Sequence, residues 1–435
     1  MNSNFRVYKV NDDTFVGIIF RNNCVELYVP SLYNIGLKKD ITDWNEILDK
    51  PAFRASFLKL LNTISIARTN EINTGSEYSD FVKSDNAFGS MLWLIKDYIN
   101  NGLYCEFGKK QLINSSGKIN WKKTLKQVPY INQNEEFIFN SLVVDKKVKV
   151  DKIITDIYKI CLQISINTIG WIWNINQKII DINGLNVVLK KYYCSVLKKE
   201  LRTTFLDSKK ERLEYLLNIL QGLSDSEKPS YSYGVKSYHV VFEKMIDKMF
   251  GNVENISDYY PSATWHFVNN VTKPASKLRP DTIMIMNNDK KYHYIIDAKY
   301  YDCKNGDYCN FPSSSDIQKQ ITYGNYLESK LDKSNIINIR NVFILPCDKT
   351  TLQQKSLLCK FAKHFNKNNN EINFDYLGYA TAKWINGNQT GKEYEKVMGF
   401  YIDLKFLIDN FNNSNDDFRN DLQTMVKEAL KTINI

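Results

Sequence analysis

The sequence predicts an α/β fold with a mixed sheet for the C-terminal half of the chain, preceded by a mostly helical region with a small β part. Two observations support this prediction. Beyond residue 230, short apolar runs of strand length alternate with segments of helical periodicity, whereas most earlier segments have the helical period. Between the two halves, residues 224–230 are polar, contain a proline and lack periodicity, which is typical of a domain boundary.

The N-terminal half begins with two apolar runs, residues 15–20 and 25–30, whose short polar separation indicates a β-hairpin. The other elements expected before the boundary are helices at 53–67, 91–98, 151–169, 185–204 and 208–222 and a strand at 137–144. We therefore expect a hairpin and helix region over residues 1–80 and a mainly helical region over residues 81–225.

The third expected region, residues 231–435, carries the α/β domain. Its predicted helices are 237–250, 316–329 and 415–432, and its predicted strands are 264–269, 281–286, 292–298, 340–346 and 374–382. This order describes a mixed sheet flanked by helices. Within it, His266 is expected to be packed on its strand, and His293 to be exposed near a turn.

Composition excludes several classes of protein. The chain has 435 residues and a formal charge of +10, which is compatible with a polyanionic partner such as DNA without requiring one. Its eight cysteines form no C-x-x-C pair, so no zinc knuckle is expected, and scattered thiols fit a cytoplasmic protein. No signal peptide, membrane-spanning run or Walker loop is recognisable, so neither a membrane association nor nucleotide binding of that type is expected.

The most informative residues are two aspartates and a lysine on neighbouring predicted strands. Asp281 opens the first strand, and Asp297 and Lys299 lie two apart on the second, so the side chains of the latter two share one face. Pairing of the strands would bring all three groups together at one edge. A structural alternative is a solvent-facing charge pair on an edge strand. Against it, the apolar residues before Asp297 indicate a central strand, where unneeded charges are unfavourable.

These groups suit phosphodiester hydrolysis. Two converging carboxylates can hold Mg²⁺, which prefers oxygen ligands and keeps several waters. The main-chain carbonyl of Ala298 is a further candidate ligand. Beside such an ion, Lys299 can orient or deprotonate the attacking water and stabilise the charge that develops on the phosphate.

Pro280-Asp281, fifteen intervening residues and then Asp297-Ala298-Lys299 resemble the PD-(D/E)xK nuclease superfamily. The longer string, from Arg279 to Tyr300, is similar to McrC-like nuclease subunits and, more closely, to the LlaJI-type restriction endonuclease family. Further segments with this resemblance are Gly117-Lys118-Ile119-Asn120-Trp121, Gly170-Trp171 and Asp316-Ile317-Gln318-Lys319-Gln320. The resemblance thus covers most of the chain from about residue 85.

The resemblance implies a restriction endonuclease that cleaves double-stranded DNA with Mg²⁺, for which Mn²⁺ can substitute. Asp281, Asp297 and the Ala298 carbonyl would bind the metal, and Lys299 would act in catalysis. A PD-(D/E)xK domain with a mixed sheet is implied, as is an AAA+ GTPase partner on a separate polypeptide. A homodimer is compatible with this reading, in which residues 1–80 are a candidate partner-binding region and residues 81–225 would bind DNA or a partner.

Two more residues are candidates by the same resemblance. Glu243, on the helix before the motif, would lie next to the metal; an exposed helix residue is the alternative. Gln320, followed by Tyr323 on the helix after the catalytic strand, would contact a phosphate or brace the site; a partly exposed helix face is the alternative. Trp121 precedes two lysines, and packing is favoured for it over contact with nucleic acid.

Two other functions stay open at this point. The first is a PD-(D/E)xK nuclease of repair, recombination or transposition, which neighbouring genes would distinguish from a restriction enzyme. The second is a non-catalytic DNA-binding or assembly protein with a nuclease-like fold. The complete set of two aspartates and one lysine argues against the second alternative.

Overall fold

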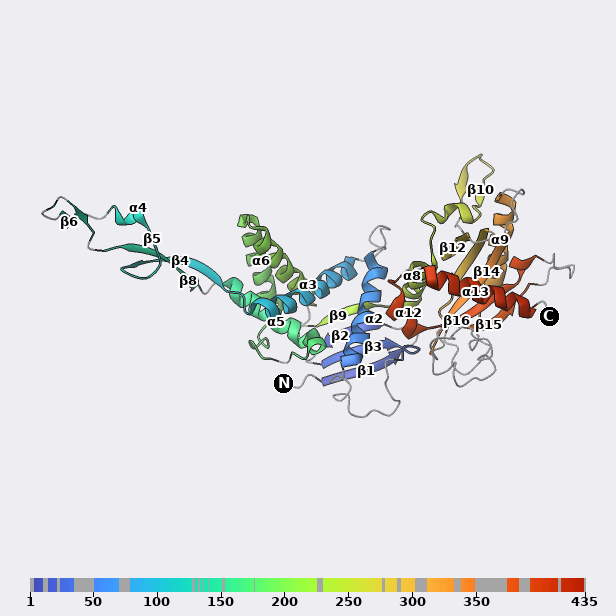
Figure 1. Ribbon diagram of the computed structural model, residues 1–435, viewed down its shortest axis with the longest axis horizontal. Helices are drawn as coiled ribbons and strands as arrows, with labels where there is room; N and C mark the ends of the chain where they lie inside the picture. The colour runs from blue at the N-terminus through green and yellow to red at the C-terminus, as the bar shows by residue number, and fades with distance from the viewer. Residues whose placement is uncertain are drawn as a thin grey trace. The chain divides into compact units, whose positions relative to one another are not determined.

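The computed structural model shows a mixed α/β protein (Figure 1). It describes residues 4–10, 15–21, 24–34, 51–69, 79–126, 130–131, 134, 136–139, 141–150, 153–175, 177–224, 230–275, 278–287, 291–301, 311–331, 338–348, 374–382, 392–413 and 416–433. Contacts divide the chain into two compact units. Unit 1 is built mainly from Ser79–Tyr231, and unit 2 from Asn4–Ile19, Cys24–Tyr78 and Ser232–Ile435.

This grouping differs from the three consecutive regions that the sequence suggests, because unit 2 contains residues from both the first and the third of them. The functional roles assigned to those regions stay predictions.

Unit 1 combines helices with small sheets. Its helices are α3 (Ser79–Asn101), α4 (Trp121–Thr124), α5 (Ile153–Ile169), the 3-10 helix η2 (Gly170–Trp173), α6 (Val187–Thr203) and α7 (Asp207–Gly222). Its strands are β4 (Glu106–Ile113), β5 (Lys118–Ile119), β6 (Tyr130–Ile131), β7 (Phe137–Ile138) and β8 (Val143–Val150), with sheet orders β4-β8-β5 and β6-β7. The expected helices are confirmed. The single strand expected at 137–144 is instead β7 followed by the start of β8, and β4 was not expected.

Unit 2 contains a small sheet with the order β1-β3-β2-β9. Its strands are β1 (Asn4–Val10), β2 (Val16–Arg21), β3 (Cys24–Pro30) and β9 (Tyr231–Val235). The two expected N-terminal strands are therefore present, as neighbours. Glycine is required where β2 meets β9, because a Cβ on Gly17, whose φ is +149°, would lie 2.1 Å from the Tyr233 carbonyl oxygen. Strands from the N-terminal end and the middle of the sequence thus approach closely.

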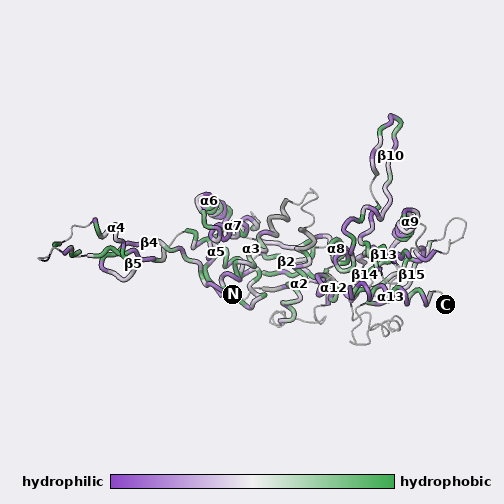
Figure 2. The backbone as a smooth tube through the Cα atoms, turned by 45° about the horizontal axis from the view of Figure 1, so that its top comes forward, coloured by the Kyte–Doolittle hydropathy of each residue, from purple (hydrophilic) through white to green (hydrophobic). Residues whose placement is uncertain are grey.

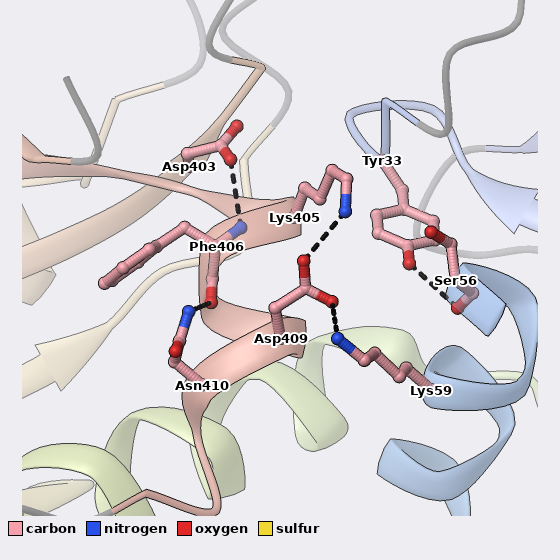
Figure 3. Close-up of polar contacts among 8 residues, drawn as sticks. All are labelled: Tyr33, Ser56, Lys59, Asp403, Lys405, Phe406, Asp409 and Asn410. Carbon is pink, nitrogen blue, oxygen red and sulfur yellow. Dashed lines mark hydrogen bonds and ion pairs between the residues drawn. The ribbon is translucent and has the colours of Figure 1, made fainter. Parts of the chain in front are cut away.

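Helix α2 (Pro51–Thr69) joins this N-terminal part to α12 (Leu404–Asn410) near the C-terminus. Figure 3 shows the contact, in which Asp409 pairs with Lys59 of α2 at 2.8 Å and with Lys405 at 2.7 Å. Although burial opposes its charged form, hydrogen bonds from both lysines lower the pKa of Asp409. The side chain of Asp403 caps α12 by accepting a hydrogen bond of 2.9 Å from the Phe406 backbone N–H.

The main sheet of unit 2 has the order β12-β13-β14-β16-β15. Its strands are β12 (Thr282–Asn287), β13 (Lys291–Ala298), β14 (Asn338–Cys347), β15 (Phe374–Ala380) and β16 (Val397–Asp403). Pairs β12/β13 and β15/β16 are antiparallel, and the inner pairs are parallel. The expected mixed sheet is confirmed, whereas β16 and α12 were not expected.

Helices cover both faces of this sheet. They are α8 (Tyr238–Phe250), α9 (Ser314–Lys330) and α13 (Asp416–Ile433), together with the 3-10 helices η3 (Ile256–Tyr259) and η5 (Glu393–Glu395). On the face that carries Ile283 and Ile295, α9 contributes Tyr323 to a buried apolar cluster. Helix α8 reaches the end of β13 through Phe242, whose ring centroid lies 5.5 Å from that of Tyr300. Since α9 connects β13 to its parallel neighbour β14, its N-terminus follows the carboxyl end of β13.

Two expectations about histidines are wrong. His293 is buried, and burial, with Lys291 nearby, lowers its pKa to about 4. His266 is exposed on β10 (Thr264–His266), which pairs with an unexpected strand, β11 (Thr272–Pro274). Both errors arise because contacts with residues distant in the sequence decide whether a side chain is buried or exposed.

Asp375 on β15 gives the stability of unit 2 a pH dependence. Its side chain is 1% exposed, and one carboxylate oxygen accepts a hydrogen bond from the Tyr376 backbone N–H, whereas the other has no partner among the described residues. Burial raises the pKa of Asp375 to about 7. The folded protein therefore keeps a proton that the unfolded chain loses near pH 4, and stability falls as the pH rises from about 4 to about 7.

We expect Asp375→Asn to raise the thermal unfolding midpoint by a few degrees at about pH 8 and to change it little at about pH 4. The amide keeps the acceptor for the Tyr376 N–H and removes the buried charge. Thermal unfolding followed by circular dichroism measures the midpoints. The prediction is contradicted if the variant and the wild type have equal midpoints at about pH 8 as well as at about pH 4.

Candidate active site

Asp281 and Asp297 meet across the antiparallel pair β12/β13. The register pairs Thr282 with Ile296, so one step further places Asp281 opposite Asp297, and opposite residues of such a pair share a face. The backbone N–H of Ala298 donates a hydrogen bond of 2.8 Å to Asp281 Oδ2. The convergence of the two carboxylates at one end of the pair, expected from their spacing, is therefore present.

Lys299 completes this cluster. Its Nζ lies 2.6 Å from Asp297 Oδ2 and 3.7 Å from Asp316 Oδ1, and these side chains are at most 20% exposed. Burial alone would lower the pKa of Lys299, but the charge and hydrogen bond of Asp297, with the charges of Asp281 and Asp316, raise it above its usual value. The amine is therefore a charged ammonium at neutral pH.

The carboxyl group of Asp281, in contrast to the amine of Lys299, is shifted toward its uncharged form. Burial, followed by the negative charges of Asp297 and Glu243, raises its pKa to about 8. Glu243 on α8 is half-buried and lies within electrostatic range of Asp281, so it is not a simple exposed helix residue. The site therefore gathers acidic groups that one ammonium does not neutralise.

Helix α9 brings Gln320 and Tyr323 to the same side of the sheet. Burial, then the charges of Asp297 and Asp281, raise the pKa of the Tyr323 hydroxyl, which places Tyr323 near both carboxylates. Gln320 is fully buried, and neither atom of its side-chain amide has a hydrogen-bond partner among the described residues. The partly exposed helix face considered from the sequence is therefore not the environment of Gln320, and its role stays a prediction.

The donor set fits a hydrated hard cation better than a closed metal cage. In the part of the chain that the structure describes, no three Asp, Glu, His or Cys side chains are close enough to bind an ion together. Two carboxylates and the adjacent Ala298 carbonyl can supply part of an octahedral shell, and Mg²⁺ keeps waters at its other positions. Burial and the charges of Asp297 and Glu243 raise the pKa of Asp281, and a cation bound there would offset this cost of its negative charge.

Comparison with known proteins identifies the family. The family model for the LlaJI restriction endonuclease matches residues 15–373, a span that includes β12, β13 and α9. The chain belongs to the LlaJI restriction endonuclease family. Membership identifies it as a nuclease of a restriction system.

Other comparisons add little. No curated protein matches the chain. Among solved structures, it is similar to a chain of a half-complex from the tetradecameric assembly of Thermococcus gammatolerans McrB AAA+ hexamers with bound McrC. The identity is 13%, the match covers 93% of this chain and 82% of that chain, and the TM-score is 0.34. Within the described residues, no helix is both long and apolar enough to cross a lipid bilayer.

Asp316 is the polar neighbour of Lys299 that sequence reasoning did not select as a site residue. It lies in the first turn of α9, where its side chain and that of Ser313 form a reciprocal capping box. The pattern Ser-x-x-Asp ahead of a helix was visible in the sequence, but its nearness to Lys299 depends on where α9 packs. Asp316 therefore both caps the helix and positions the ammonium.

We expect Asp316→Asn to slow DNA cleavage roughly tenfold, because Lys299 then keeps only one carboxylate partner. Ser313→Ala is the matched control, since it removes the hydroxyl from the capping box and leaves the Asp316 charge in place. Single-turnover cleavage rates and thermal unfolding separate the two effects. If both variants lose stability equally and both keep the parent rate, Asp316 acts as a cap alone.

Trp121 in unit 1 differs from its expected environment. It was expected to pack, but its side chain is 55% exposed and is followed by exposed Lys122 and Lys123. Trp121 is the first residue of α4, and this helix of four residues is too short to bury the side chain.

Proposed function

We propose that the chain is a Mg²⁺-dependent endonuclease that hydrolyses phosphodiester bonds of double-stranded DNA in a restriction system. The observation that carries the proposal is the meeting of Asp281, Asp297 and Lys299 at the end of β12/β13. Family membership supports the nuclease activity, and the donor set supports the choice of a hard cation. When bound there, Mg²⁺ supplies Lewis-acid stabilisation of the phosphate oxygens and lowers the pKa of a bound water.

The side chains of the proposed site would have separate roles in this reaction. Asp281 and Asp297, with the Ala298 carbonyl, hold the cation. Lys299, whose Nζ lies 2.6 Å from Asp297 Oδ2, would orient or deprotonate the attacking water and stabilise the charge that develops on the phosphate. Both roles that the sequence leaves open to Lys299 stay part of the proposal. Glu243 and Gln320 complete the proposed site as a nearby carboxylate and a buried amide donor.

An AAA+ GTPase partner is part of the same proposal, on the basis of the sequence resemblance to McrC-like subunits. Residues 1–435 contain no Walker loop, and the resemblance to McrC-like subunits implies a motor on a separate polypeptide. Co-purification of this chain with an AAA+ protein encoded beside it tests this point. If the two proteins never co-purify, the partner is removed from the proposal.

Metal removal provides the central test. We expect the chain to nick or cut plasmid DNA in Mg²⁺ and to lose all cleavage in EDTA, and Mn²⁺ should restore activity to the chelated protein. Asp281→Ala should abolish cleavage in both metals, because one of two side-chain ligands is missing. Cleavage that persists in EDTA would contradict the proposal. Duplex binding without cleavage under every metal would instead favour an assembly protein with a nuclease-like fold.

A further inference from the structure

The hairpin formed by β10 and β11 leaves unit 2 just before the strand that follows Asp281. Thr264 pairs with Pro274 and His266 with Thr272, and the Phe267 backbone N–H donates a hydrogen bond of 2.9 Å to the Val271 carbonyl. Asn270 in the connecting turn has a φ of +58°, a conformation that asparagine tolerates well. The hairpin projects from the remainder of unit 2 (Figure 2).

Every residue from 262 to 274 is exposed, so neither face of this ribbon packs against unit 2. Its large apolar side chains nevertheless gather on the ribbon, with the Trp265 ring 63% exposed and stacked on Phe267 at a centroid distance of 6.4 Å. Val268 and Val271 in the turn are also exposed. Isolated two-stranded ribbons are marginally stable in water, and exposed apolar clusters mark interaction sites. The hairpin therefore lacks a binding partner that would cover it.

The position and charge of the hairpin indicate what that partner is. Pro274 precedes Asp281 by seven residues, so the end of the ribbon lies within about 25 Å of the first carboxylate. Residues 259–280 contain no Asp or Glu, and they include Lys273, Lys277 and Arg279. The ribbon itself carries Lys273 and no acidic residue, so an apolar ribbon with one cation near the proposed nuclease site complements a polyanion whose grooves display apolar methyl groups.

We infer that the β10–β11 hairpin is a DNA-contacting element that enters the major groove next to the scissile phosphate. The major groove admits a two-stranded ribbon, its thymine methyl groups accept apolar contacts, and the turn asparagines supply amide hydrogen bonds to base edges. Lys273 reaches a backbone phosphate. The inference rests on the proposed function, because it takes duplex DNA as the substrate of the neighbouring site.

The test uses the full chain carrying Asp297→Asn, so that DNA is bound without being cut. In this background, Trp265→Ala with Phe267→Ala removes the aromatic stack, and Tyr379→Ala on β15 is the control, since Tyr379 is 50% exposed on another element of unit 2. Affinity for a fluorescein-labelled duplex of mixed sequence is measured by anisotropy, and oligomeric state by sedimentation velocity.

We expect the aromatic double variant to bind the duplex roughly tenfold more weakly, because it loses apolar surface that would be buried in the groove, and the control to bind like its parent. A separate Lys273→Ala variant should lower the salt dependence of binding by about one counterion. Circular dichroism checks that each variant is folded. Unchanged affinity in both hairpin variants overturns the inference, as does a parent that fails to bind. A change in sedimentation with unchanged affinity also overturns it, since a second copy of the chain would then cover the hairpin.

This experiment separates the two proposals. If the hairpin inference fails alone, metal-dependent cleavage by the wild-type chain and its loss in Asp297→Asn persist. If the proposed function fails, either the wild-type chain does not cleave DNA with any metal, or Asp297→Asn cleaves as the wild type does.

Discussion

Asp297→Asn should lower the rate of Mg²⁺-dependent DNA cleavage at least roughly 10³-fold. The substitution keeps the size of the side chain but removes one of the two carboxylates that meet at the end of β12/β13. An amide oxygen is a weaker ligand for Mg²⁺ than a carboxylate oxygen, and the substitution removes the negative charge that pairs with Lys299 at 2.6 Å. Single-turnover cleavage of plasmid DNA, followed on agarose gels, measures the effect.

The control for Asp297→Asn is Asp258→Asn, because Asp258 pairs with a lysine on α9 but is 70% exposed. It removes a surface charge from the same unit and should leave cleavage unchanged, since exposed ion pairs contribute little. Thermal unfolding shows whether the Asp297 variant stays folded. A folded Asp297→Asn protein that cleaves at the parent rate would disprove the metal site.

Lys299→Ala is expected to reduce the cleavage rate about 10²- to 10⁴-fold, the range for loss of a positioned proton-bearing group. The variant loses the ammonium that pairs with Asp297 and Asp316, and no other lysine or arginine of the described residues pairs with either of them. Because both carboxylates of the proposed metal site remain, Mg²⁺ binding should persist. For this variant, isothermal titration should therefore show that Mg²⁺ still binds, and single-turnover assays should show that cleavage is slowed.

The comparison for Lys299→Ala is Lys330→Ala on α9, whose side chain is 42% exposed and pairs with Asp258. We expect no change in its cleavage rate. Lys299→Arg keeps the charge but not the compact shape of the ammonium, so it should recover only part of the lost rate. Full activity in Lys299→Ala would mean that the lysine has a structural role and that another group orients the attacking water.

The local part of this site was predictable from the sequence. The two-residue period of a strand places Asp297 and Lys299 on one face, and the hairpin spacing places Asp281 opposite them. The helix with Gln320 was predicted from its periodicity, and so was the mixed character of the sheet. Each of these features depends on residues that are close in sequence, where periodicity carries the information.

The remaining features depend on distant contacts. Strand β9 completes a sheet with residues near the N-terminus, and no local pattern in Tyr231–Val235 specifies that partner. Strand β16, between β14 and β15 in the sheet, was missed although all seven of its residues are buried. The pairing of Asp316 with Lys299 requires the N-terminus of α9 to return to the end of β13. Tertiary packing determines each of these three features, and the periodicity of the sequence does not predict such packing.

The pairing of Lys59 with Asp409 joins the earliest and latest parts of unit 2. During synthesis on the ribosome, Ser79–Tyr231 emerges as one continuous stretch and can fold while translation proceeds, whereas α2 must wait for α12 before its partner exists. The half of the protein that bears the acidic cluster is therefore completed last. A polypeptide terminated before β16 and α12 would carry unit 1 but lack an inner strand of the sheet that holds the acidic cluster.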